Sequence, residues 1–385
     1  MRKIICLMLI ISLLIGSTVF GFAAEQQPMV FTGPSVELSL QGAKDRMLSD
    51  GAPIAMAEFN RRMNNAMTRA SFESYAQVMT PTRVDTVDGR EIVIRMPLTQ
   101  REVAEFALVF NREQTPRNYD AEVNQIIRDV VQQYYQLAHA RENLRISRDN
   151  VAIQQTLYEN TQNMFNLGLR SRQDVLMAEL GLNEARVRAE AAENALNNAR
   201  MGFNIAFGFD LMQNVTLTDS LNAAPLPDTS LQEAIGMALE NRNEIHGANF
   251  GFALAELAMR DATARLSRFS AAHIRAEANL MGATAEKTNA PKRIEMDIRT
   301  RYMNMHHRKN EVELGRLNLS NAQEASRLAD LQFNAGMITL VETQQAQLMA
   351  FNAELGYYSA LLEYNLAIID FELATTVGTR PIILN

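Results

Sequence analysis

The stretch FNLGLRSRQD at residues 165–174 returns as FNAGMITLVE at residues 333–342. The same offset of 168 residues aligns about 80 residues without a gap, placing Tyr134 on Tyr302 and Phe203 on Phe371. An internal repeat of this length determines the architecture before any single motif is considered. Each copy predicts a long helix, a sharp turn at glycine and a second long helix that folds back.

The two turns carry the signals that end one helix and begin the next. Gly168 and Gly336 fit the left-handed residue that follows a helix C-terminus. Ser171 with Asp174, and Thr339 with Glu342, have capping-box spacing. We therefore predict the two carboxylates to be helix caps first and functional groups second.

Apolar residues recur every seven positions along the first helix of each copy. In the first copy they are Val123, Val130, Leu137, Leu144, Val151, Tyr158 and Phe165. In the second they are Ile298, Met305, Val312, Leu319 and Phe333, with Ser326 as a polar break. This spacing indicates a coiled coil, and a helix of about 44 residues would reach about 66 Å.

The returning helix of each copy has apolar residues spaced alternately by four and three. They are Ala178, Leu182, Ala185, Ala189, Ala192, Leu196, Ala199, Phe203 and Ala206, then Ala346, Ala350, Ala353, Tyr357, Ala360, Tyr364, Ala367, Phe371 and Ala374. Alanine buries little area but lets helix backbones approach closely. Close side-by-side packing of long helices is expected, and the core of an ordinary helical bundle is the alternative.

Residues 1–23 have the organisation of a secretory signal peptide. Arg2 and Lys3 form a positive region, residues 4–15 are apolar, and small residues precede a cleavage position after Ala23. An uncleaved membrane anchor is the alternative, but the apolar run is short for a membrane span.

The repeat divides the rest of the chain into two halves. The predicted segments are a first half at residues 24–207, a linker at 208–229, a second half at 230–378 and a C-terminal tail at 379–385, with long hairpins at 120–207 and 292–378. Ser230 and Glu233 have capping-box spacing at the start of the second half, and residues 38–43 resemble this phrase. Each half is therefore expected to open with a shorter helix.

Composition excludes several classes of function. The one cysteine, Cys6, lies in the signal peptide, so the mature chain is predicted to hold no disulfide and no thiolate site. Without Arg2 and Lys3 the chain has 35 basic and 44 acidic residues, a net charge of −9. A chain of this charge repels phosphate backbones, so we expect no nucleic-acid partner.

The sequence offers no pattern for catalysis. The histidines are scattered at His139, His246, His273, His306 and His307. The adjacent pair at 306 and 307 would point about 100° apart on a helix and could not easily share a metal ion. Phosphate loops, a Ser-His-Asp arrangement and paired carboxylates are not evident. We therefore predict no catalytic, cofactor or metal site, and no enzyme activity.

The duplicated phrase Phe-x-x-Gly, a polar turn and an acid six residues after the glycine resembles the TolC family of outer-membrane efflux proteins. The phrase SLQEAIGMALENRNEI at residues 230–245 is similar to the start of a half in that family. The resemblance implies a homotrimer whose helices form a hollow α-helical cylinder in the periplasm, open toward a β-barrel in the outer membrane. It also implies a passive exit duct in a multi-protein efflux or secretion system, exporting small molecules or proteins.

In that family the glycine turns form the periplasmic tip, which contacts a periplasmic adaptor (membrane fusion) protein and an inner-membrane pump or ABC transporter. The corresponding tip residues here are Gly168, Leu169, Arg170, Ser171, Gly336, Met337, Ile338 and Thr339. Asp174 and Glu342 are candidate gate residues or helix caps. Phe333, Ile338 and Gln345 depart from the polar gate of the family, which favours the capping role.

The family inserts two strands into each half, and this chain shows few of them. Residues 82–87 and 90–96 flank Asp88-Gly89, a hairpin signal with short arms, whereas residues 99–111 look helical. In the second half only residues 271–280 alternate, and weakly. We expect a mainly α fold of duplicated long antiparallel coiled-coil hairpins in a trimeric α-barrel, with a small, reduced or absent β-barrel portion.

A non-conducting coiled-coil protein of the cell envelope, acting as a spacer or tether, is the alternative to the duct. Either protein would be exported to the outer membrane or periplasm.

Overall fold

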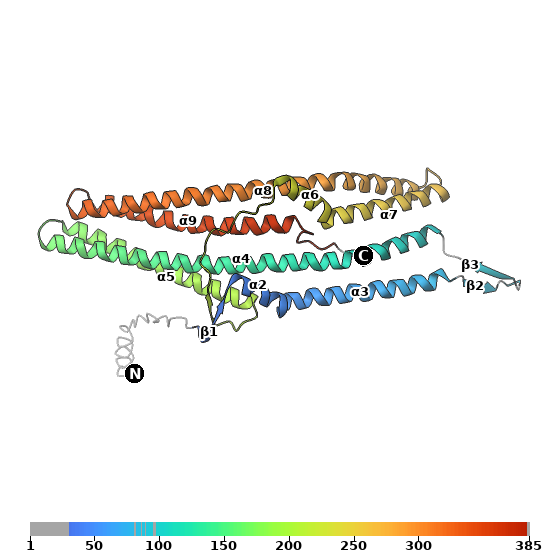
Figure 1. The fold of residues 1–385 in the computed structure, drawn as a ribbon, viewed down its shortest axis with the longest axis horizontal. Helices are drawn as coiled ribbons and strands as arrows, with labels where there is room; N and C mark the ends of the chain where they lie inside the picture. The colour runs from blue at the N-terminus through green and yellow to red at the C-terminus, as the bar shows by residue number, and fades with distance from the viewer. Residues whose placement is uncertain (1–30, 81, 86, 89, 95–97, 383–385) are drawn as a thin grey trace, which may run out of the picture.

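The computed structural model describes residues 31–80, 82–85, 87–88, 90–94 and 98–382. The signal peptide predicted at residues 1–23 lies outside the described residues. In the described part, long helices run along the molecule (Figure 1).

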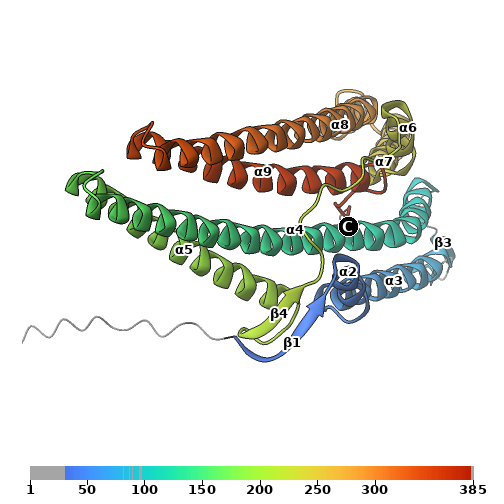
Figure 2. The same ribbon diagram turned by 60° about the vertical axis from the view of Figure 1, so that its left-hand side comes forward.

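Two long antiparallel hairpins form the body of the protein, as the repeat predicts. The first consists of α4 (Leu98–Asn166) and α5 (Arg172–Ala206), and the second of α8 (Ala271–Asn334) and α9 (Leu340–Ala374). The two hairpin turns lie at the same end of the molecule in both views (Figures 1 and 2). Because α4 also packs on α9, the two hairpins form one body.

Helices α4 and α8 begin well before the predicted hairpin ranges. Their N-terminal parts pack against α3 (Ala52–Met79) and α7 (Asn243–Arg265) instead of against a returning helix. The seven-residue spacing of apolar residues reflects contact with the returning helix. It therefore did not indicate the N-terminal parts of α4 and α8, which do not contact that helix. Pro291 lies inside α8, where a proline removes a backbone hydrogen bond without ending the helix.

A shorter helix opens each half, as expected. These helices are α2 (Leu40–Ser49) and α6 (Leu231–Asn241). The hydroxyl groups of Ser39 and Ser230 accept from backbone amides in the first turn of each helix. Ala43 and Ala234, which occupy the same place in the two phrases, are both completely buried.

Two small sheets accompany the helices. β1 (Thr32–Leu38) pairs in parallel with β4 (Gln213–Leu217), so the predicted linker contains a strand. β2 (Thr82–Asp85) pairs antiparallel with β3 (Glu91–Ile94), which confirms the short hairpin.

The weak strand expected at residues 271–280 is wrong, because these residues form the first turns of α8. The Ser270 hydroxyl caps the helix by accepting from the His273 amide at 3.2 Å. His273 and Ala276 are buried at a spacing of three, which is a helical period. The apparent alternation therefore came from alanines, which favour helix.

The predicted seam residues form the core where the four long helices meet. Tyr134, Phe203, Ile298 and Phe371, one from each long helix, are at most 1 % exposed. The other predicted seam positions are buried or half-buried, apart from Ala206, which is exposed at the last residue of α5. Among the described residues, no helix combines the length and the apolar character that membrane crossing requires.

Candidate functional site

The two hairpin turns have the same backbone geometry. Gly168 and Gly336 have φ angles of 74° and 73°, in the left-handed region that favours glycine. The Gly168 amide donates to the Phe165 carbonyl at 2.9 Å, and the Gly336 amide donates to the Phe333 carbonyl at the same distance. Each turn therefore closes its helix with the same C-terminal motif.

Asp174 and Glu342 act as caps. The Asp174 carboxylate accepts from the Ser171 amide at 3.0 Å, and that of Glu342 accepts from the Thr339 amide at 2.8 Å. The hydroxyl groups of Ser171 and Thr339 accept in return from the amides of the two acids. Hydrogen bonds from Thr339 lower the pKa of Glu342. Both side chains hold the start of a returning helix in this structure.

The eight predicted tip residues separate into two groups. Gly168, Leu169, Ser171, Gly336, Met337 and Thr339 are exposed. Arg170 and Ile338, which occupy equivalent places in the repeat, are half-buried and lie between the two turns. The Arg170 guanidinium donates to the carbonyl oxygens of Phe333 and Ile338, at 3.2 and 3.1 Å. One arginine of the first turn therefore holds the second turn.

Polar side chains join the hairpins a few turns away from the tip. Gln154 of α4 donates to Gln347 of α9 at 2.9 Å, and Gln347 donates to Asp330 of α8 at 2.7 Å. Burial raises the pKa of Asp330, and the hydrogen bond from Gln347 partly offsets this effect. This contact between the hairpins is polar and lies beside a small buried apolar cluster of Leu157, Ala178, Phe333 and Leu340.

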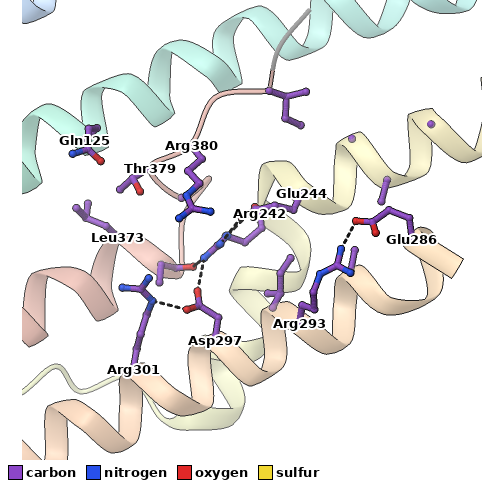
Figure 3. Close-up of a pocket in the computed structure, with 18 of the residues that line it drawn as sticks. Gln125, Arg242, Glu244, Glu286, Arg293, Asp297, Arg301, Leu373, Thr379 and Arg380 are labelled. Carbon is purple, nitrogen blue, oxygen red and sulfur yellow. Dashed lines mark hydrogen bonds and ion pairs between the residues drawn. The ribbon is translucent and has the colours of Figure 1, made fainter. Parts of the chain in front are cut away.

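A second candidate site is a cavity of about 890 Å³ near the C-terminal end of the described chain (Figure 3). The cavity is lined by residues from α4, α7, α8 and α9 and from residues 378–382, the last described residues of the chain, which are called the tail from here on. We call it the arginine cavity, because five arginines face it: Arg128, Arg242, Arg293, Arg301 and Arg380. No motif or spacing in the sequence marks this site, because its residues come from separate segments.

Four of these arginines form ion pairs. Arg128 contacts Asp370 at 2.6 Å, and Arg301 contacts Asp297 at 2.9 Å. Arg242 lies between Glu244 at 2.5 Å and Asp297 at 3.1 Å (Figure 3). Arg293 pairs with Glu286. The neighbouring carboxylates raise the pKa of Arg242 and outweigh the effect of its burial, so its charge is fixed.

Three asparagines hold the tail across the cavity. Asn118 donates to the Ile382 carbonyl at 2.7 Å, Asn124 to that of Gly378 at 2.8 Å, and Asn243 to that of Arg380 at 3.3 Å. Gly378 turns the chain with a φ of 82°, and a Cβ atom there would approach Arg242 Nε to 3.1 Å. The tail is therefore fixed by its backbone, and the Arg380 side chain is left exposed.

Histidines and acids do not gather into a metal site in the described part of the chain. His246 stacks on Phe110, with ring centroids 5.2 Å apart, and its Nδ1 donates to the Gln114 side-chain oxygen at 2.8 Å. Burial lowers the pKa of His246, which favours the neutral ring. This histidine belongs to the packing of α7 on α4.

The sequence and the fold were compared with those of known proteins. Residues 107–206 match the model of the outer membrane efflux protein family. No curated protein sequence matches the chain.

Solved structures share the fold over most of its length. The CmeC outer membrane channel of Campylobacter jejuni has a TM-score of 0.68 at 14 % identity, covering 88 % of this chain and 86 % of its own. The outer membrane protein VceC of Vibrio cholerae has a TM-score of 0.70 at 11 % identity, covering 89 % and 97 %. The MtrE outer membrane channel of Neisseria gonorrhoeae has a TM-score of 0.63 at 15 % identity, covering 89 % and 90 %.

Proposed function

We propose that the chain belongs to the TolC family of outer-membrane efflux proteins and is a passive exit duct of the cell envelope, because residues 107–206 match that family's model and the fold is shared with solved outer-membrane channels. Members of this family are channels and not enzymes. The duct would serve a multi-protein efflux or secretion system and pass small molecules or proteins that a separate pump drives.

The observation that carries this proposal is the equivalence of the two hairpins. They lie side by side with their turns at one end, and the 168-residue offset is a multiple of seven, so both copies keep the same seam phase. Long helical hairpins of this kind can occupy equivalent positions around a closed α-helical cylinder. Three chains would supply six hairpins, in keeping with a homotrimer.

Exposed apolar side chains support contact between copies. One face of α3 carries Met56, Phe59, Met63 and Met67, each between 43 % and 60 % exposed. Apolar faces of this length are usually covered by another protein surface. A neighbouring copy would bury this face in the wall of the cylinder.

The hairpin tip is the proposed contact for a periplasmic adaptor protein. Leu169 and Met337 are 70 % and 77 % exposed at equivalent places in the two turns. Apolar side chains on a rigid turn suit a helical or loop-shaped partner. An inner-membrane pump or ABC transporter would complete the assembly, with the duct located at the outer membrane and periplasm.

The adaptor contact can be tested by site-specific crosslinking, since the one cysteine, Cys6, lies in the predicted signal peptide. A single cysteine in Met337→Cys should capture the adaptor in intact cells, whereas Leu211→Cys, exposed in the segment after α5, should not. Deletion of the gene should also make cells hypersensitive to exported compounds. An unchanged sensitivity together with no adaptor adduct would favour a non-conducting spacer or tether.

A further inference from the structure

We propose that the arginine cavity is a binding site for organic anions, in particular a carboxylate attached to an apolar body. Its lining residues come from α4, α7, α8, α9 and the tail, at the other end of the long hairpins from their turns (Figure 1). Its existence does not depend on the proposed duct, because binding can be measured on the isolated protein.

The charge of the cavity favours an anion. Its lining contains the five arginines against four acids, Glu244, Glu286, Asp297 and Asp370. Each acid pairs with an arginine, which leaves one positive charge without a carboxylate. This local excess stands out in a chain whose net charge is −7.

The unpaired charge belongs to Arg380. Within the described ranges, its guanidinium has no hydrogen-bond or ion-pair partner, while its backbone carbonyl accepts from Asn243. Figure 3 shows its side chain directed toward the cavity beside Arg242. A guanidinium binds a carboxylate through two parallel hydrogen bonds, so Arg380 can hold an incoming carboxylate without breaking an existing pair.

Small residues provide room for the apolar part of the ligand. The lining includes Gly247, Ala248 and Gly251 of α7 and Ala283 and Ala290 of α8. A Cβ atom added at Gly251 would meet no atom within 4 Å, so this part of the wall opens into free space. The volume of about 890 Å³ lies within the range of small-molecule sites.

Apolar side chains at the edge complete the site. Phe252 and Ile382 line the cavity on the side of α7 and the tail. The tail lies close to α7, since a Cβ atom at Gly247 would approach Ile382 Cδ1 to 2.8 Å. A flat aromatic or alicyclic body would therefore contact apolar atoms while its carboxylate reaches Arg380.

Binding can be measured with 2-naphthoate, whose fluorescence anisotropy is free of tryptophan background because the chain contains no tryptophan. We expect saturable binding to the full-length protein, and binding of the neutral 2-naphthamide at least about tenfold weaker. Arg380→Gln should weaken 2-naphthoate binding about tenfold, as expected for losing a hydrogen-bonded charge pair. Arg69→Gln removes an exposed charge from α3 and should leave binding unchanged.

A second pair of variants tests the place of the apolar body. Gly251→Leu should fill the cavity and abolish binding, whereas Gly236→Leu makes the same exchange at an exposed position of α6 and should not. The proposal is overturned if 2-naphthoate does not bind, or if the amide binds equally well. It is also overturned if either cavity variant binds like the wild type while remaining folded by circular dichroism.

Discussion

The guanidinium of Arg170 lies over the ring of Phe333, 4.3 Å from its centroid, and thereby joins the turn of the first hairpin to the second. The residue equivalent to Arg170 in the repeat is Ile338, which cannot make this contact in return. The two copies are thus alike in backbone and different in the side chains that connect them. One arginine therefore adds polar contacts between the turns to the apolar cluster of Leu157, Ala178, Phe333 and Leu340.

Replacing this arginine should loosen the second turn. Arg170→Ala removes a cation–π contact and two hydrogen bonds to carbonyl oxygens, together about 1–3 kcal/mol at a half-buried site. Amide hydrogen exchange at residues 333–338 should therefore become faster. Arg172→Ala, at the exposed first residue of α5, should leave exchange there unchanged. Equal exchange in wild type and Arg170→Ala would show that the contact does not hold the turn.

Replacement by alanine should destabilise the protein at the two turn glycines and stabilise it at a glycine inside a helix. Gly168→Ala and Gly336→Ala place a side chain at positive φ, at a cost of about 1–2 kcal/mol. Gly202→Ala, inside α5 with no atom within 4 Å of the new Cβ, should stabilise its helix by about 0.5–1 kcal/mol. Local opening free energies from hydrogen exchange would measure both effects. Stabilisation at the turns would contradict the left-handed geometry.

The cap of α9 should depend on pH. The pKa of Glu342 is lower in the folded protein than its usual value of 4.5, because the ionised carboxylate accepts from Thr339. Its stabilising contribution is therefore complete above the unfolded pKa and disappears as the pH falls through the lower folded pKa.

The neutral variant Glu342→Gln isolates this effect. Amide hydrogen exchange gives the local opening free energy at the start of α9. The difference in this free energy between wild type and variant should shrink as the pH is lowered from about 6 to about 3. Glu190→Gln, at an exposed position of α5, is the matched control and should show no such trend. A difference that stays constant over this range would exclude a charged cap.

A buried tyrosine should connect the linker to α4. The Tyr134 hydroxyl donates to Asp219 at 3.0 Å and lies 3.2 Å from the Leu38 carbonyl, at the ends of β4 and β1. Burial raises its pKa, so the hydroxyl stays protonated and able to donate. Tyr134→Phe should lower the free energy of unfolding by about 1–2 kcal/mol.

The matched control for this variant is Tyr158→Phe, because the described structure gives the Tyr158 hydroxyl no hydrogen bond. Urea denaturation at fixed protein concentration would compare the two. If both variants unfold at the same urea concentration, the hydroxyl of Tyr134 does not anchor the linker.

The sequence predicted the features that repeat. Seven-residue spacing identified the buried faces of α4 and α8, because a coiled coil returns the same face to its partner at that period. Capping residues gave the starts of α5, α6 and α9, since Ser, Thr, Asp and Glu bond the free amides of a first turn.

Features that depend on contacts between distant segments were not predictable in this way. The pairing of β1 with β4 joins residues about 180 positions apart and leaves no periodic signal in the short strand at 213–217. The arginine cavity likewise draws Arg128, Arg242, Arg301 and Arg380 from four separate segments. Each of these arginines alone looks like an ordinary charged residue on a helix or tail.

The shape of the assembled protein tests the proposed duct most directly. Electron cryo-microscopy of the full-length protein, extracted from cells and purified, should show a hollow cylinder with three-fold symmetry and six hairpin tips at one end. A stable monomer or dimer, or a trimer without a continuous central channel, would contradict the proposed duct.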